Sequence, residues 1–213
     1  MADNHIRVML VDDHSVVRNG VRLMLETAGD IEIAGEAETA QDAIRLVREK
    51  DFDVALVDIG LPDQNGLELL KFLRTEKPKL AVLMLSMYSE EIYAMRAIKQ
   101  GAAGYLTKNI TASILVAAVR KTAAGGKHVS PELGEKLVNV FGGKVKVSHE
   151  TLSDRELEVL KLLAAGEKLV NIAEILHLSP STVTTYRARI LEKTGVDSNA
   201  KLARYALENG LLT

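Results

Sequence analysis

The sequence predicts an α/β domain built on a five-stranded parallel sheet, followed by a small all-α domain of four helices. Over residues 5–124, short apolar runs alternate with segments whose apolar residues recur at helical spacing. Strands that alternate with helices over such a length indicate a parallel sheet covered on both faces. From residue 152 onward only the helical spacing remains, so a different fold class follows the first.

The expected strands of the first domain are short apolar runs bounded by Gly, Pro, Asn, Asp or Ser. They cover residues 6–11, 31–37, 54–58, 80–85 and 103–106. The helices that follow them show an apolar stripe of period 3.6 and often end at glycine. They cover residues 15–28, 39–49, 66–76, 90–100 and 111–124.

The domain boundary is expected at the glycine pair 125–126. We therefore place the first domain at 1–125, a linker at 126–147 and the second domain at 148–213. A short helix over 131–141 is expected inside the linker, with Pro near its first turn. The glycine-rich stretch after that helix is typical of a flexible tether.

The second domain begins with a capping box, in which Ser153 caps the helix and Glu156 stands three residues later. Further helices are expected over 170–176, 180–193 and 200–208. The second and third helices are short and are joined by a tight turn, which is the pattern of a helix-turn-helix. Any small helical bundle can resemble this pattern, so it does not by itself establish DNA binding.

Composition narrows the class of protein. The chain has 213 residues, of which 47% are hydrophobic and only 4% aromatic, so aliphatic side chains must fill its cores. It has no cysteine, which excludes disulfides, thiol catalysis and Cys-ligated metal sites. No signal peptide or apolar membrane span is recognisable, so a cytoplasmic protein is expected. The net charge is −2, so any DNA-binding surface must be locally positive.

Polar side chains stand at the carboxyl ends of four expected strands. Asp12 and Asp13 follow the first strand, Asp58 ends the third, Ser86 follows the fourth and Lys108 follows the fifth. Parallel strands bring these ends to one edge of the sheet, where ligand sites lie. A lone Asp58 could simply cap the next turn. Three converging carboxylates, however, require a divalent cation or partial protonation, and hard oxygen donors suit Mg²⁺.

These residues carry a resemblance to a known family. Residues 5–124 resemble the flavodoxin-like (βα)5 receiver domain of two-component systems, and the C-terminal part resembles the LuxR-type DNA-binding domain. Together they are similar to response regulators of the NarL/FixJ type. The matching receiver motifs are Asp12-Asp13, D-x-x-L-P at 58–62, Asn65-Gly66, Ser86 and GAAGYLTK at 101–108, and the matching LuxR-type motifs are LSDRE at 152–156, IAEIL at 172–176, Thr182-Val183 and Gly195-Val196.

The resemblance implies that Asp58 is phosphorylated by a sensor histidine kinase or a small phosphodonor. Asp13, Asp58 and the backbone carbonyl of Gly60 would bind Mg²⁺ directly, with Asp12 nearby through water. Lys108 would neutralise a phosphoryl oxygen. Such a protein catalyses only its own phosphoryl transfer and dephosphorylation, and is not an enzyme in the usual sense.

The resemblance also implies a switch pair. Ser86 would move to hydrogen-bond the phosphoryl group, and Tyr105 would turn inward into the vacated space, giving two discrete packings. Without the resemblance, a strand-end hydroxyl and a half-buried core aromatic would explain the two residues. His14 follows the acidic pair and is expected to be packed or solvated.

In the LuxR-type domain, the helix over 180–193 would enter the DNA, since arginines can read guanine edges and hydroxyls can bind phosphates. The side chains expected to face the DNA are Ser181, Thr182, Thr184, Thr185, Arg187, Ala188, Arg189 and Lys193. Many relatives have a lysine where this chain has Thr184, and another in the second helix, which predicts a greater need for a homodimer on promoter DNA. The last helix, 200–208, is the candidate dimer contact.

Three alternatives stay open at this point. A haloacid-dehalogenase-type phosphohydrolase needs a second Asp two residues after the nucleophile, where this chain has Gly60. A flavodoxin-like nucleotide-binding module needs a glycine-rich loop after the first strand, where Asp12-Asp13-His14 stands instead. A regulator that binds DNA without phosphorylation would keep the same fold and leave the pocket unused.

Overall fold

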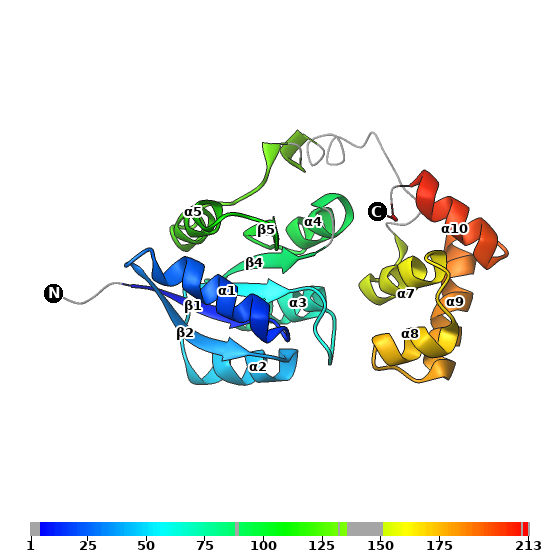
Figure 1. Ribbon diagram of the computed structural model, residues 1–213, viewed down its shortest axis with the longest axis horizontal. Helices are drawn as coiled ribbons and strands as arrows, with labels where there is room; N and C mark the ends of the chain where they lie inside the picture. The colour runs from blue at the N-terminus through cyan, green and yellow to red at the C-terminus, as the bar shows by residue number, and fades with distance from the viewer. Residues whose placement is uncertain (1–4, 88–89, 132, 136–150, 210, 213) are drawn as a thin grey trace. The chain divides into compact units, whose positions relative to one another are not determined.

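The computed structural model describes residues 5–87, 90–131, 133–135, 151–209 and 211–212 (Figure 1). The chain divides into two compact units, Met1–Leu137 and Val138–Thr213. None of the helices within the described residues is long and apolar enough to cross a membrane. The predicted tether over 142–149 lies outside the described residues.

The first unit is built on one sheet in which all neighbouring strands are parallel. Its strand order is β2-β1-β3-β4-β5, so the chain moves first to one edge and then crosses back past β1. The strands are β1 Ile6–Val11, β2 Ile31–Ala37, β3 Val54–Asp58, β4 Ala81–Ser86 and β5 Gly104–Thr107. The prediction of a five-stranded parallel sheet is confirmed, and only β4 and β5 are displaced, by one residue each.

Helices cover both faces of this sheet (Figure 1). The helices are α1 Ser15–Glu26, α2 Ala40–Glu49, α3 Gly66–Glu76, α4 Glu90–Lys99 and α5 Ala112–Ala123. α1 and α5 pack on each other on one face, while α3 contacts both α2 and α4. Every residue of β3 is buried, as expected for a central strand with helices on both sides.

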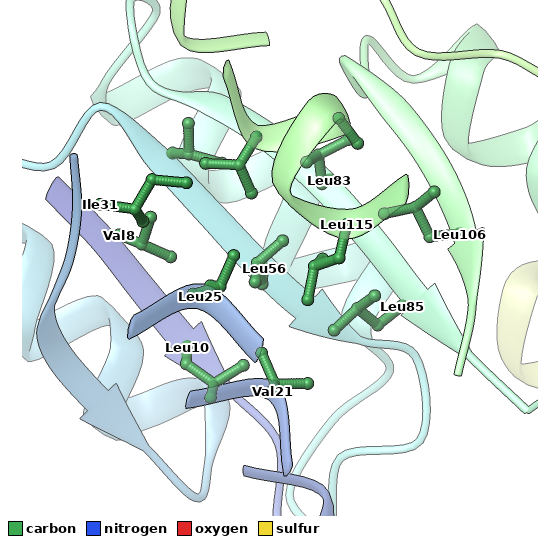
Figure 2. Packing of buried hydrophobic residues seen from close by; sticks show 13 residues of the cluster. Val8, Leu10, Val21, Leu25, Ile31, Leu56, Leu83, Leu85, Leu106 and Leu115 are labelled. Atoms are coloured by element: carbon green, nitrogen blue, oxygen red, sulfur yellow. The ribbon is translucent and has the colours of Figure 1, made fainter. Parts of the chain in front are cut away.

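Figure 2 shows the core between the sheet and the α1 and α5 helices. Aliphatic side chains fill it, as the low aromatic content requires. The strands contribute Val8, Leu10, Ile31, Val54, Leu56, Leu83, Leu85 and Leu106, and the helices contribute Val21, Leu25, Leu115, Ala118 and Val119. Because alternate residues of a strand face opposite sides, this cluster also identifies which β1 side chains point toward α1.

The chain after α5 stays attached to the first unit. The His128 backbone N–H donates to the Ala103 carbonyl over 2.8 Å, and His128 pairs with Gly104 as an isolated parallel bridge on the free edge of β5. Leu133 is also buried. The first compact unit therefore continues to Leu137, beyond the boundary that the glycine pair suggested.

The second unit is a small all-α domain, as predicted. Its helices are α7 Asp154–Ala164, α8 Leu169–Ile175, α9 Pro180–Thr194 and α10 Asn199–Glu208. The capping box is formed: the Ser153 side chain accepts from the Glu156 N–H, and the Glu156 carboxylate accepts from the Ser153 N–H. The core consists of Leu157, Val159, Leu160, Leu163, Ile172, Ala173, Val183, Ile190, Leu202, Ala206 and Leu211.

A tight turn joins α8 to α9. His177 has φ 51° and is the one non-glycine residue with positive φ within the described part of the chain. Its N–H donates to the Glu174 carbonyl over 3.2 Å, and the Leu178 N–H donates to the Ala173 carbonyl over 2.8 Å. These two bonds form a Schellman motif. The Ser179 side chain then caps α9 directly, which fixes the direction in which α9 leaves the turn.

Gly66 tests how tightly the β3–α3 connection is built. A Cβ at Gly66 would lie 2.0 Å from the backbone oxygen of Asp58, so Gly66→Ala must displace the end of β3. We expect it to lower the unfolding free energy by about 3 kcal/mol or more, measured by urea unfolding. Gly20→Ala on α1 is the control, because nothing lies within 4 Å of its Cβ. It should stabilise by about 0.5–1 kcal/mol; similar effects of both variants would contradict this packing.

Candidate functional site

The parallel register brings four polar side chains to the carboxyl edge of the sheet. Asp58 ends β3 beside Leu85 of β4, and Ser86 ends β4 beside Thr107 of β5. The Lys108 N–H donates to the Ser86 carbonyl over 2.8 Å, which ties the ends of β4 and β5 together. Asp12 follows β1, and its N–H donates to the Ala37 carbonyl over 3.1 Å. The strand ends are therefore level, and their side chains converge.

Lys108 bridges two carboxylates at the centre of this edge. Its Nζ lies 2.7 Å from Asp12 Oδ2 and 2.8 Å from Asp58 Oδ2. The three side chains are 5%, 0% and 7% exposed. Two carboxylates are thus held in a largely dry position by one shared ammonium, which leaves the group of charges net negative.

Burial and charge both act on the ionisation of these groups. Burial raises the pKa of Asp58 above its ordinary value and outweighs the opposing effect of Lys108, while the Asp12 charge adds to the rise. Burial acts to lower the pKa of Lys108, but Asp58 and Asp12 outweigh it, so that pKa is raised and the ammonium stays charged. The Asp58 carboxylate is accordingly a group that a further nearby cation would stabilise in its ionised form.

The donor set of this site fits a hard divalent cation. Asp12, Asp13, His14 and Asp58 each place one ligand atom within 4.8 Å of the others. Carboxylate oxygens are the ligands that Mg²⁺ prefers, and Mg²⁺ typically keeps several waters and uses only a few protein ligands. Asp13 is 32% exposed, so the cluster opens to solvent on the side of Asp13. Asp12, Asp13 and Asp58 would hold the ion.

His14 belongs to this cluster more closely than its sequence context indicated. Its Nδ1 lies 2.7 Å from Asp13 Oδ1, and its N–H donates to Asp12 Oδ1 over 2.9 Å. The imidazole is 64% exposed, in agreement with a solvated side chain. The only sequence signal for its position is that it directly follows the acidic pair.

Ser86 and Tyr105 lie on neighbouring strands β4 and β5. Both are fully buried, with relative exposures of 0% and 1%, and Tyr105 pairs in register with Met84, two residues before Ser86. The Tyr105 ring is therefore shielded from solvent in this structure. Exposed Gly60, two residues after Asp58, contacts the Asp58 carboxylate through a backbone hydrogen bond.

Asp63 is a structural residue of the site that the sequence reasoning did not single out. Its two carboxylate oxygens accept from the backbone N–H groups of Ala40 and Gln41, each over 2.9 Å. The loop after β3 thus caps the N-terminus of α2, where a carboxylate is favourable. Only the fold makes this contact visible, because the partners stand more than twenty residues apart.

The predicted DNA-facing side chains of α9 fall into three groups. Val183 and Ile190 point into the core, which leaves the opposite face open. Ser181, Thr184, Thr185, Ala188 and Arg189 are exposed, Thr182 and Arg187 are partly buried, and Lys193 is exposed but paired. Arg187 Nε donates to Asn199 Oδ1 over 2.8 Å, and Lys193 Nζ lies 2.6 Å from Glu156 Oε2.

A lysine bridges a buried Asp at a strand end to a second Asp, in an α/β domain that the same chain joins to a helix-turn-helix domain. This combination defines a class of two-domain proteins with a receiver-like sheet domain followed by a helix-turn-helix domain. The comparisons with known families agree. Residues 8–120 match the response regulator receiver domain, and residues 150–206 match the luxR family of bacterial regulatory proteins. The chain belongs to the NarL/FixJ-type response regulators, which are transcriptional regulators.

Relatives of similar length support this assignment. The response regulator GacA of Pseudomonas aeruginosa is 34% identical over 209 residues, covering 97% of this chain and 98% of GacA. The response regulator UvrY of Escherichia coli is 32% identical over 208 residues, covering 97% and 95%. A solved structure of two RcsB dimers bound to two parallel DNAs aligns with a TM-score of 0.60 and 26% identity, covering 95% of this chain and 98% of that one.

The capping box of α7 makes a pH-dependent contribution to the DNA-binding domain. Burial would raise the pKa of Glu156, but hydrogen bonds from Lys193 and Ser153 outweigh it, and the pKa is lowered. The stabilisation is therefore complete above the ordinary value of 4.5 and is lost as pH falls through the lowered one. Glu156→Gln should cost about 1–2 kcal/mol at pH 7, and this cost should shrink as pH falls through the lowered pKa, measured by urea unfolding at several pH values.

Asp197 provides the control for Glu156. Its ion pair with Lys201 is at the surface, with the carboxylate 72% exposed, so Asp197→Asn should change stability little at any pH. An equal loss in both variants, or a loss at Glu156 that does not depend on pH, would contradict a stabilising role for the ionised capping box.

Proposed function

We propose that Asp58 is the phosphoacceptor of this response regulator and that its phosphorylation by a sensor histidine kinase switches binding to promoter DNA. The observation that carries the proposal is the Lys108 ammonium, which lies within 2.8 Å of both Asp12 and Asp58 at the carboxyl edge of the sheet. A lysine at this position can stay paired with the acceptor group both before and after Asp58 is phosphorylated. Because promoter DNA is its proposed target, the protein is proposed to act in the cytoplasm.

The chemistry is nucleophilic attack by a carboxylate oxygen. An Asp58 Oδ attacks phosphorus, the bond from phosphorus to the histidine nitrogen of the donor breaks, and an acyl phosphate forms. Bound Mg²⁺ would supply charge neutralisation on the phosphoryl oxygens. Lys108 contributes a second, permanent positive charge. Gly60 and Asp13 line the solvent side, where the donor histidine enters.

The proposed switch acts through Ser86 and Tyr105. Phosphorylation places an acceptor group next to Ser86, whose hydroxyl would hydrogen-bond it. Tyr105 is buried in this structure, and its ring is proposed to move further inward into the space that Ser86 vacates. The two residues would thereby convert a local change of charge into a choice between two packings of β4 and β5.

DNA binding is assigned to α9, with two copies of the chain acting together. The RcsB structure contains dimers bound to DNA, which supports a homodimer for this chain as well. On α10, Leu202 and Ala206 are buried in the domain core, whereas Leu207 is 65% exposed. We therefore place the dimer contact of the DNA-binding domains around Leu207, so that two α9 helices enter successive turns of the duplex.

Replacement of Asp58 tests the acceptor site. With Mg²⁺ and acetyl phosphate, the wild-type chain should gain the mass of one phosphoryl group, and Asp58→Ala should gain none. Asp63→Ala is the matched control, because Asp63 lies in the loop that follows Asp58 but binds the α2 amides. It should still be labelled. Labelling of Asp58→Ala would refute the assignment, and labelling without any change in assembly or DNA affinity would favour the phosphorylation-independent regulator.

Arg189 and Lys193 of α9 are expected to contribute differently to DNA affinity and to its salt dependence. Arg189 is exposed, and no hydrogen bond or ion pair of its side chain is found among the described residues, whereas Lys193 is paired with Glu156. Arg189→Ala should weaken binding and reduce the slope of log K against log salt by about 0.9 per lost phosphate contact. Lys193→Ala should leave the slope nearly unchanged. Equal slopes for both variants would show that Lys193 leaves Glu156 to bind DNA.

A further inference from the structure

Arg18 reaches from α1 to the end of β1. Its guanidinium donates from one terminal nitrogen to the Asp12 backbone carbonyl over 2.7 Å and from the other to the Glu38 carboxylate. Its Nε lies 3.6 Å from Glu36 Oε2. The Arg18 side chain is only 11% exposed, although its Glu38 partner lies at the surface. No step of the proposed phosphoryl transfer uses this residue.

A bulge in β2 creates the acidic partners of Arg18. Val8 pairs with Ile33 and Met9 with Gly35, so one extra residue lies on β2 between these pairs, and Leu10 then pairs with Glu36. Leu10 belongs to the core on the α1 side. The bulge therefore turns the Glu36 side chain toward α1. Without the bulge, Gly35 would pair with Leu10 and Glu36 would face the other side of the sheet. Helix α1 provides two basic partners for Glu36, because both Arg18 and Arg22 form ion pairs with it.

The contact to Asp12 completes a clamp on one peptide. The Asp12 N–H donates to Ala37 of β2, and its carbonyl accepts from Arg18. Its carboxylate accepts from the His14 N–H and pairs with Lys108. The main chain of Asp12 is thus held on both sides at the point where its carboxylate, and that of Asp13, must converge on Asp58.

We propose that Arg18 is a positioning residue for the divalent-cation site: by holding the Asp12 carbonyl it fixes the direction of the Asp12 and Asp13 carboxylates and so increases the affinity for Mg²⁺. This inference rests on the proposed function, because it assumes that the carboxylates bind the ion. Partners that orient metal ligands from outside commonly change metal affinity by 10–100-fold.

A purely electrostatic effect of Arg18 on Mg²⁺ affinity would have the opposite sign to the proposed positioning effect, so the two can be distinguished. Arg18 is a permanent cation close to a cation site, so loss of its charge alone would tighten Mg²⁺ binding by removing repulsion. Loss of its positioning effect would weaken binding. Arg22 offers a matched comparison: it lies one turn further along α1 and shares the Glu36 partner, but within the described residues its side chain does not bind Asp12.

The experiment is titration calorimetry of Mg²⁺ into the unphosphorylated full-length chain. Arg18→Gln should raise the Kd about tenfold, whereas Arg22→Gln should leave it unchanged or slightly lower. Arg18→Lys, which keeps one donor for the Asp12 carbonyl, should recover much of the affinity. At saturating Mg²⁺ the rate of labelling by acetyl phosphate should match the wild type, which separates metal affinity from the transfer step.

The outcomes separate the two proposals. Unchanged or tighter Mg²⁺ binding by Arg18→Gln would overturn the positioning role and leave the phosphoacceptor assignment intact. Absence of Mg²⁺ binding by the wild-type chain would instead overturn the metal site of the proposed function. If Arg18→Gln does not fold, Arg18→Met is compared with Arg22→Met: weakening confined to Arg18→Met supports the inference, and unchanged binding by Arg18→Met overturns it.

Discussion

The structure of the receiver domain depends on how a parallel sheet places like charges together. Parallel strands end at a common edge, and here two of the carboxylates at that edge are fully buried or nearly so. Buried charges are stable only when they are paired. Lys108 supplies one positive charge for Asp12 and Asp58, so the edge keeps excess negative charge. A bound cation or an incoming phosphoryl group with its metal changes that balance, and the site is therefore sensitive to both.

Strand β5 links this charge balance to the rest of the chain. It is only four residues long, yet it carries the buried Tyr105, leads directly into Lys108, and pairs on its free edge with His128. Gly104 has no alternative there, because a Cβ would lie 2.3 Å from the His128 oxygen. A change at Lys108 or Tyr105 thus acts on the strand that also holds the segment leaving the domain. The connection from Lys108 and Tyr105 to the segment around His128 is short because all three lie on or beside β5, and it needs no special linker chemistry.

Sequence patterns were sufficient wherever the physical cause is local. Apolar runs bounded by turn residues located all five strands, and the Ser153 capping box located the start of α7, because both signals lie within a few neighbouring residues. Contacts between distant segments were not predictable in this way. The pairing of His128 with Gly104, the bulge that turns Glu36 toward Arg18, and the ion pair of Lys193 with Glu156 each depend on tertiary register. A one-residue shift in β2 reverses which side chains face α1, and composition does not record such a shift.

The ion pair of Lys193 with Glu156 reduces the number of free positive side chains on α9. Glu156 holds Lys193, and Thr184 and Thr185 donate their hydroxyls to the carbonyls one turn earlier in α9. Side chains that are already engaged offer a phosphate less than free ones. Because the net charge of the chain is −2, one copy depends on locally clustered positive groups to release counterions from DNA. Two linked copies raise the effective concentration of the second helix without adding contacts. If phosphorylation switches DNA binding as proposed, dimer assembly, rather than the helix itself, is therefore the step at which it would control affinity.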